Sequence, residues 1–272
     1  VRRVTSFLYM FYGATSFNQD LPWDTSSGTT FYRMFEEATS FNGILSGWTL
    51  ATSTTTGSNC LTSSSGCPVY RMFYGASSFV GNGLDTWEVS GLRTMHTMFY
   101  YAAAFNGKIG AWNVSNVEGG ASSLFRGCTN FNQDLSKWNV SRITSFKQAF
   151  YGATAFNSNI STWDVSRVTS FYTMFYGATS FNQDLPWDTS SGTTFYQMFY
   201  SATSFNGVLS GWTLATGTSS TWNSGPVFQM FNGATSFVGK GLETWDVSGL
   251  RAINYMFNGA TSFNGKIGAW DV

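Results

Sequence analysis

The sequence is poor in the residues from which most catalytic and metal sites are built. Its 272 residues include one histidine and three cysteines. One histidine without a suitably spaced cysteine pair does not support a zinc or Cys–His site, and three cysteines are too few for a disulfide scaffold. His96 lies between Met95 and Met98, where we expect a surface-facing strand position. The chain also lacks a phosphate-binding glycine loop or a nucleophile motif. We therefore expect neither an enzyme nor a cofactor.

Charge is scarce as well. Charged residues make up 10% of the chain, and 14 basic residues balance 14 acidic ones. Without a basic stripe to neutralise phosphates, nucleic acid is excluded as a partner. No apolar run approaches the roughly 20 residues that cross a bilayer, so we expect no membrane span in this segment. Low charge with abundant Ser, Thr, Gly and Asn favours an extracellular or cell-surface location.

Aromatic residues are plentiful, at 18% of the chain, and they follow a repeat. Its most regular element reads M-F-x-x-A-x-x-F-N. A tryptophan follows in each copy, and only Trp222 lies outside the pattern. Ten copies are spaced 24 to 26 residues apart, apart from two longer steps of 38 and 32. The first phenylalanines of the ten copies are Phe11, Phe35, Phe73, Phe99, Phe125, Phe150, Phe175, Phe199, Phe231 and Phe257.

The two longer steps are Ser/Thr-rich insertions, residues 51–68 and 215–226, and both follow the sequence Gly-Trp-Thr-Leu-Ala-Thr. We expect them to be surface loops on equivalent coils. A longer duplication contains them, because residues 3–52 match residues 167–216 at 44 of 50 positions. The chain is thus predicted to be one continuous array over 1–272, with a six-coil block over 1–164 and the start of a second block over 165–272.

A unit of about 25 residues cannot bury its own apolar face and must stack on its neighbours. The sequence therefore predicts a repeat solenoid of ten coils, with one short parallel β-strand per coil from the Val-Thr-Ser-Phe stretch. The Met-Phe-x-Gly-Ala stretch is expected to form a short helical or 3₁₀ turn on the opposite wall. At the strand spacing of about 4.8 Å, ten coils extend about 50 Å. In one coil the predicted inward residues are Trp163, Val165, Val168, Phe171, Met174, Phe175, Ala178, Phe181 and Leu185.

Small and polar positions of the repeat have structural interpretations. Cys128 replaces the repeated alanine and is expected to be a small buried residue, with a reactive thiol as the alternative. Cys60 and Cys67 are close enough in sequence to close the first insertion as a disulfide. Asparagine follows the second phenylalanine in eight coils, which predicts a ladder of side chains bonded to the backbone; a row of ligand-binding amides is the alternative. These residues are Asn18, Asn42, Asn106, Asn132, Asn157, Asn182, Asn206 and Asn264.

Tyrosine follows the Met-Phe step in six coils and is expected to point outward. The residues are Tyr12, Tyr74, Tyr100, Tyr151, Tyr176 and Tyr200. They form either a self-supporting ladder of rings or an interaction surface for glycans or a neighbouring rod.

Recurring acids are expected to cap or bend the backbone, with calcium between coils as the minor alternative. They are Asp20, Asp134, Asp164, Asp184, Asp246 and Asp271. Three sequons begin at Asn113, Asn139 and Asn159 and would carry glycans in a eukaryotic secretory host.

The full motif, MFYGATSFNQDLSxWDVSxVT, resembles the BspA-like surface-protein repeat, which is also known from mycoplasma lipoproteins and related to leucine-rich repeats. The resemblance covers essentially the whole chain except the two insertions. It implies a right-handed, leucine-rich-repeat-like coil stack at the cell surface, with adhesive or scaffolding roles and no catalytic residues to transfer. The insertions and the Pro-Trp-Asp-Thr coils at Trp23 and Trp187 depart from it.

Two functions follow from these features. The first is an extracellular structural protein forming a stiff rod, whose partners are further repeats of a longer chain or other copies joined end to end or laterally. This expectation rests on the absence of capping coils at either end. The alternative is an adhesin that binds glycans, host proteins or neighbouring surface proteins through the tyrosine ladder.

Overall fold

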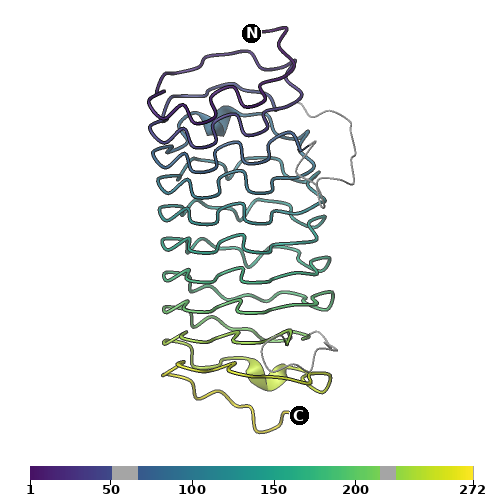
Figure 1. Cartoon of the computed structure of the whole chain (residues 1–272). Helices are drawn as coiled ribbons and strands as arrows, with labels where there is room; N and C mark the ends of the chain where they lie inside the picture. The colour runs from purple at the N-terminus through teal and green to yellow at the C-terminus, as the bar shows by residue number, and fades with distance from the viewer. Residues whose placement is uncertain (51–66, 215–224, 272) are drawn as a thin grey trace.

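The computed structural model describes residues 1–50, 67–214 and 225–271. Figure 1 shows the chain winding through successive coils that lie one below another, with the two termini at opposite ends of the stack. We number the coils 1 to 10 by their first phenylalanine, from Phe11 to Phe257. Every coil thus contacts mainly the coil before it and the coil after it in sequence.

Columns of equivalent aromatic rings form the core. The first phenylalanines stack without interruption through all ten coils, and the predicted stacking of Phe175 on Phe199 is confirmed by a centroid distance of 5.5 Å. The second phenylalanines form a parallel column, and each packs against the first phenylalanine of its own coil, as Phe181 does on Phe175 at 4.1 Å. All nine residues predicted to point inward in the coil from Trp163 to Leu185 are buried, which confirms that assignment.

The tryptophans join each coil to the preceding one. The indole N–H of Trp48 donates to the carbonyl oxygen of Leu21 at 2.9 Å, and Trp163 donates to Leu135 at 3.0 Å. The same bond is made by seven further tryptophans: Trp87, Trp112, Trp138, Trp187, Trp212, Trp245 and Trp270. A buried indole N–H needs an acceptor, and here the acceptor is always a backbone carbonyl one coil back.

An eight-residue segment, here called the ribbon, repeats in every coil. Its first, fourth, fifth and eighth residues point into the core, as Phe171, Met174, Phe175 and Ala178 do. The other four residues point outward. The ten ribbons cover residues 7–14, 31–38, 69–76, 95–102, 121–128, 146–153, 171–178, 195–202, 227–234 and 253–260.

Backbone hydrogen bonds explain the shape of the ribbon. Alternate N–H groups donate to the next coil: Phe171 to Thr194, Thr173 to Tyr196 and Phe175 to Met198. The N–H groups between them turn back three residues within the coil. The third ribbon residue has positive φ in all ten coils, as Thr173 does at 47°, and so does the seventh, which is usually glycine. The ribbon is therefore a row of tight turns that is hydrogen-bonded along the stack.

This arrangement differs from the predicted strand and helical turn. Within the described ranges the only β-bridges are isolated parallel ones, such as Ser145 to Ser170 and Ser170 to Thr194, next to the ribbon rather than on a wall opposite it. The left-handed third and seventh residues interrupt any α-helix, because their N–H groups bond to the next coil instead of the fourth preceding carbonyl.

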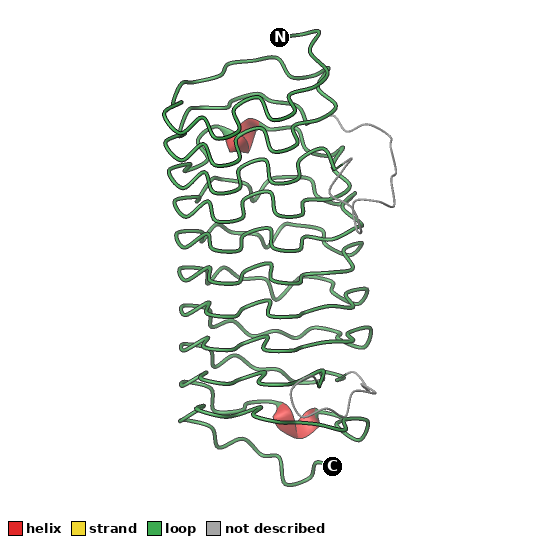
Figure 2. Ribbon diagram, viewed as in Figure 1, coloured by secondary structure: helices red, strands yellow, loops and turns green. Residues whose placement is uncertain are grey.

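Figure 2 shows the helices of the described chain, which are two short 3₁₀ segments outside the ribbon. They are η2 (Leu84–Thr86) and η3 (Leu242–Thr244), at equivalent positions of the two sequence blocks, and each follows a left-handed glycine. The described residues contain no helix long and apolar enough to cross a membrane.

Candidate functional site

One side of the stack gathers a single residue type. All thirteen tyrosines of the chain occupy outward ribbon positions. We call the surface made by the outward residues of the ten ribbons the tyrosine face. Sequence reasoning identified only six of these tyrosines, because it considered only the sixth ribbon position. The signal for the others was the residue that follows the phenylalanine at the start of a ribbon, such as Tyr172 and Tyr196.

The predicted ladder at the sixth ribbon position is present over much of the stack. Tyr151, Tyr176 and Tyr200 stack nearly parallel, with centroids 4.5 and 4.6 Å apart. Tyr74 and Tyr100 stack at 4.9 Å. Burial raises the pKa of Tyr176, and the neighbouring phenols add to the increase. Neutral phenol groups therefore form this row at physiological pH.

Arg126 links the two parts of this ladder. It occupies the tyrosine position in coil 5, and its guanidinium lies 5.2 Å from the ring of Tyr100 and 4.2 Å from the ring of Tyr151. A planar cation over aromatic faces replaces a ring in the stack. The ladder thus runs through six coils, from Tyr74 to Tyr200. The sequence-based ladder missed Arg126 because it tracked tyrosine alone.

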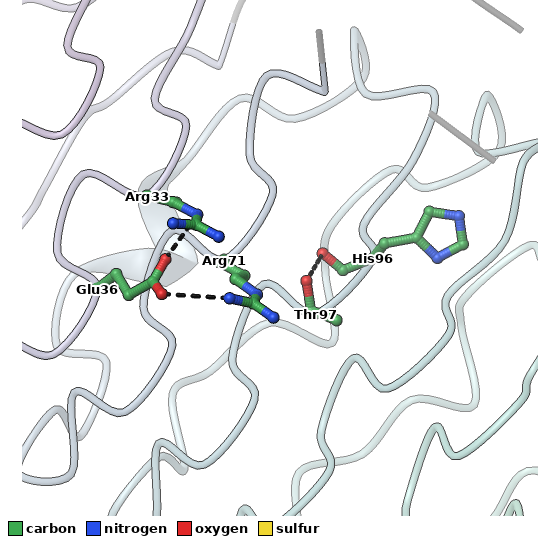
Figure 3. A network of polar contacts seen from close by, with 5 residues as sticks. All are labelled: Arg33, Glu36, Arg71, His96 and Thr97. Atoms are coloured by element: carbon green, nitrogen blue, oxygen red, sulfur yellow. Dashed lines mark hydrogen bonds and ion pairs between the residues drawn. The ribbon is translucent and has the colours of Figure 1, made fainter. Parts of the chain in front are cut away.

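Tyr12 stands apart from this ladder. It meets Tyr9 edge-on at 5.7 Å, while coil 2 carries Glu36 at the tyrosine position. Figure 3 shows that Glu36 lies between Arg33 and Arg71, with ion-pair distances of 3.1 and 3.4 Å. Burial raises the pKa of Glu36, and the two guanidinium groups oppose that shift.

A second ladder occupies the second ribbon position. Tyr172 stacks on Tyr196 at 4.9 Å, and Tyr196 stacks on Phe228 at 5.3 Å. The ammonium of Lys147 lies 5.3 Å from the ring of Tyr172 and extends this row by one coil. Near the N-terminus, Tyr32 stacks on Tyr70 at 5.5 Å. The tyrosine face therefore carries two parallel rows of rings.

The repeated asparagines form bonds between coils on another part of the surface. The Oδ1 of Asn157 accepts the backbone N–H of Asn182 at 2.8 Å, and the Oδ1 of Asn182 accepts that of Asn206 at 2.8 Å. Asn18, Asn42, Asn106, Asn132 and Asn206 make the equivalent bond to the following coil. Because these oxygens already hold backbone N–H groups, they act as coil-to-coil links.

The recurring acids also accept backbone hydrogen bonds. Asp246 accepts the N–H and the hydroxyl of Ser248 at 3.1 and 2.7 Å, and these bonds lower its pKa. Asp184 reaches the next coil, where its Oδ1 accepts the N–H of Val208 at 2.8 Å. Asp20, Asp134 and Asp164 likewise accept backbone N–H groups. Among the described residues no three or more His, Cys, Asp or Glu side chains cluster as metal ligands.

The sequon asparagines are exposed and hold turns of the same kind. Asn113 and Asn139 each accept the N–H and hydroxyl of the serine two residues later. Asn159 accepts the N–H of Ser161 at 2.9 Å. Their carriage of glycans stays a prediction.

His96 does not occupy the surface-facing position that its sequence context favoured. Its Nδ1 accepts the N–H of Ser122 at 3.2 Å, and its Nε2 is buried without a hydrogen-bond partner. Burial lowers its pKa. The histidine occupies the second ribbon position, where neighbouring coils hold flat rings, and the stacked coils cover it from both sides.

The cysteines have separate surroundings. Cys128 is fully buried, its thiol donates to the carbonyl of Phe99 at 2.9 Å, and burial raises its pKa well above the ordinary value. These features fit a packing role. Cys60 lies outside the described residues, so the Cys60–Cys67 disulfide stays a prediction.

Comparison with known families identifies the repeat. The family described as "Mycoplasma protein of unknown function, DUF285" matches residues 1–66, 67–185, 120–222 and 218–272. The chain belongs to the DUF285 family. The matches are repeated along the sequence, so this DUF285 chain is a repeat protein. Among curated proteins, no match was found.

Proposed function

We propose that this DUF285 chain is a stiff structural segment of a cell-surface or extracellular repeat protein, built as a right-handed, leucine-rich-repeat-like coil stack related to BspA-like repeats. The observation that supports it best is the unbroken stacking of both phenylalanine columns through ten coils. Bending the stack would open these contacts, which pack at interior density. A continuous core therefore favours a stiff rod.

The use of the polar groups supports a structural role over an enzymatic one. The repeated asparagines and several recurring acids accept backbone hydrogen bonds in a fixed pattern. Catalytic sites instead need polar groups that converge and break such a pattern. We therefore propose that the segment is not an enzyme and needs no cofactor.

Small-angle X-ray scattering tests the rod. We would compare this chain with a tandem chain in which residue 272 is joined to residue 2 of a second copy, which continues the repeat in register. Ten added coils at about 4.8 Å should lengthen the particle by about 48 Å and leave its cross-section unchanged. A tandem particle that grows in all three dimensions would contradict the proposal.

The surface location needs its own test. Antibody labelling of intact, unpermeabilised cells that make the protein should be as strong as labelling of permeabilised cells. Signal that appears only after permeabilisation would argue against a surface protein.

A recognition role for the tyrosine face is the second candidate, because all thirteen tyrosines gather there. Their stacking restricts the ligand. Both faces of Tyr176 are covered by Tyr151 and Tyr200, so a ligand meets ring edges and hydroxyl groups. Sugar rings that bind by stacking need an open ring face, which makes protein surfaces the better candidates for adhesion.

A further inference from the structure

Charge is distributed unevenly over the tyrosine face. All of its formally charged residues lie in coils 2 to 6: Arg33, Glu36, Glu37, Arg71, Arg126 and Lys147. Four cations and two carboxylates give this half a net charge of +2. Coils 7 to 10 contribute no charged residue to the face. The tyrosine face thus has a cationic half and an uncharged half.

The uncharged half has the composition of a protein interface. Tyr172, Tyr176, Tyr196 and Tyr200 are half-buried and held by stacking, and Gln197 lies between the two rows of rings. Rigid tyrosines supply contact area at a low entropy cost, and amide side chains adapt their hydrogen bonds. Tyrosine enrichment with depletion of Asp, Glu and Lys distinguishes interface centres from the rest of a surface.

The spacing of the rows restricts what can match them. Successive tyrosines in the rows are 4.5 to 4.9 Å apart, which is close to the strand spacing of about 4.8 Å. A partner that contacts several coils in the same way must repeat with the same rise. A second copy of this chain has that rise by construction.

Orientation then follows from charge. If two copies paired in parallel, Arg33, Arg71 and Arg126 would face the same cations of the partner, and like charges in contact are costly. An antiparallel pair about a two-fold axis instead places the cationic half of each copy on the uncharged rings of the other. The side chains of Arg33 and Arg71 keep 23% and 31% of their surface exposed, and cations bind favourably at aromatic surfaces.

We propose that the tyrosine face pairs with the tyrosine face of a second copy, antiparallel and about a two-fold axis. The inference rests on the proposed rod only in requiring an ordered face over several coils. It names a lateral contact that leaves both ends of the stack free.

The test is a charge series at Gln197 in the uncharged half. Arg33 is the equivalent residue in the first sequence block, so Gln197→Arg introduces a side chain that this ribbon position already accepts. Gln197→Glu introduces the opposite charge at the same place. Ser204→Arg is the control, because it adds the same charge to an exposed position of the same coil outside the ribbon.

Sedimentation equilibrium measures the outcome as the dimer dissociation constant. We expect wild type to dimerise from 29.9 kDa protomers. Gln197→Arg should weaken the dimer about three- to tenfold, because the two-fold axis repeats each new repulsion; Gln197→Glu should strengthen it by a similar factor at low salt. Ser204→Arg should leave the constant unchanged.

Other results would overturn the pairing. Weakening by both Gln197 variants would indicate parallel copies, since residue 197 would then meet itself. An equal effect of Ser204→Arg would place the contact elsewhere. A wild-type monomer at about 100 µM, or a monomer that binds a glycan or an unrelated protein through this face, would replace the second copy as the occupant. Scattering from the same monomer would still report a rod, so the two proposals fail separately.

Discussion

Two glycines of neighbouring coils should respond differently to the same added methyl group. Gly177 is the seventh ribbon residue, with φ of 65°, and an added Cβ would have its nearest neighbour at 4.0 Å, the Cα of Gly152. Gly207 has ordinary φ, but its Cβ would lie 2.0 Å from the carbonyl oxygen of Gln183. The first site has space but a strained backbone; the second has a relaxed backbone but no space.

The expected magnitudes follow from these geometries. Gly177→Ala costs about 1–2 kcal/mol for a left-handed alanine, reduced by the lower entropy of the unfolded chain. Ser201, which has φ of 54° at the same ribbon position, shows that the site accepts a side chain. Gly207→Ala requires two coils to separate locally and to lose packing, so we expect a loss of about 3 kcal/mol or more.

Urea unfolding followed by tryptophan fluorescence and by far-UV circular dichroism measures both losses. The comparison uses midpoints at equal m-values, because repeat arrays can unfold in parts. The two variants also act as mutual controls, since each adds only one methyl group. A larger loss for Gly177→Ala than for Gly207→Ala would refute the assignment of strain to one site and of close contact to the other.

Three further predictions concern the interior and the links between coils. Asn157→Ala should cost about 1–3 kcal/mol by leaving the N–H of Asn182 without its acceptor, whereas the equivalent change at Asn264, for which no such bond to a following coil occurs among the described residues, should cost less; urea midpoints of the two variants decide. Ala178→Leu should cost about 1–3 kcal/mol because the site is fully buried, and unchanged thermal stability would contradict its inward position. His96 has a lowered pKa in the folded chain, so the unfolded chain binds its proton more tightly and stability should fall as pH drops below about 6.5. His96→Tyr, the residue found at this position in coils 3 and 7, should abolish that loss between pH 7 and pH 5, a range above the titration of the carboxylates; a variant with the wild-type pH profile would show that another group is responsible.

The sequence predicted which residues are buried better than it predicted the backbone. Apolar residues at the first, fourth, fifth and eighth ribbon positions have the spacing of an amphipathic helix, which explains the expected helical turn. Inward placement of Phe171, Met174, Phe175 and Ala178 was nevertheless correct. A row of turns that are left-handed at the third and seventh residues produces the same inward positions as a helix.

The left-handed residues themselves were hard to foresee. The third ribbon position holds Tyr, Arg, Thr, Ser or Gln and never glycine, so composition gave no sign of positive φ there. The conformation is imposed by hydrogen bonds to the next coil, which over-determine the backbone.

The candidate site was predicted only in part, for a related reason. One tyrosine row was visible as a repeated letter, but Arg126 and Lys147 join the rows through stacking, which depends on flat or cationic groups rather than on residue identity. The partial burial of His96 likewise depends on the coils above and below it. Such contacts connect residues about 25 positions apart and are set by the stack as a whole.

The hydrogen bonds between coils have a direction, and this bears on how such a gene can change. Each tryptophan bonds backward and each asparagine bonds forward, so every coil presents the same acceptors upstream and the same partners downstream. Deletion or duplication of one complete period would rejoin matching surfaces, whereas a change by part of a period would leave both sides mismatched. Unequal recombination between the near-identical DNA segments should therefore yield viable proteins that differ in length by whole coils.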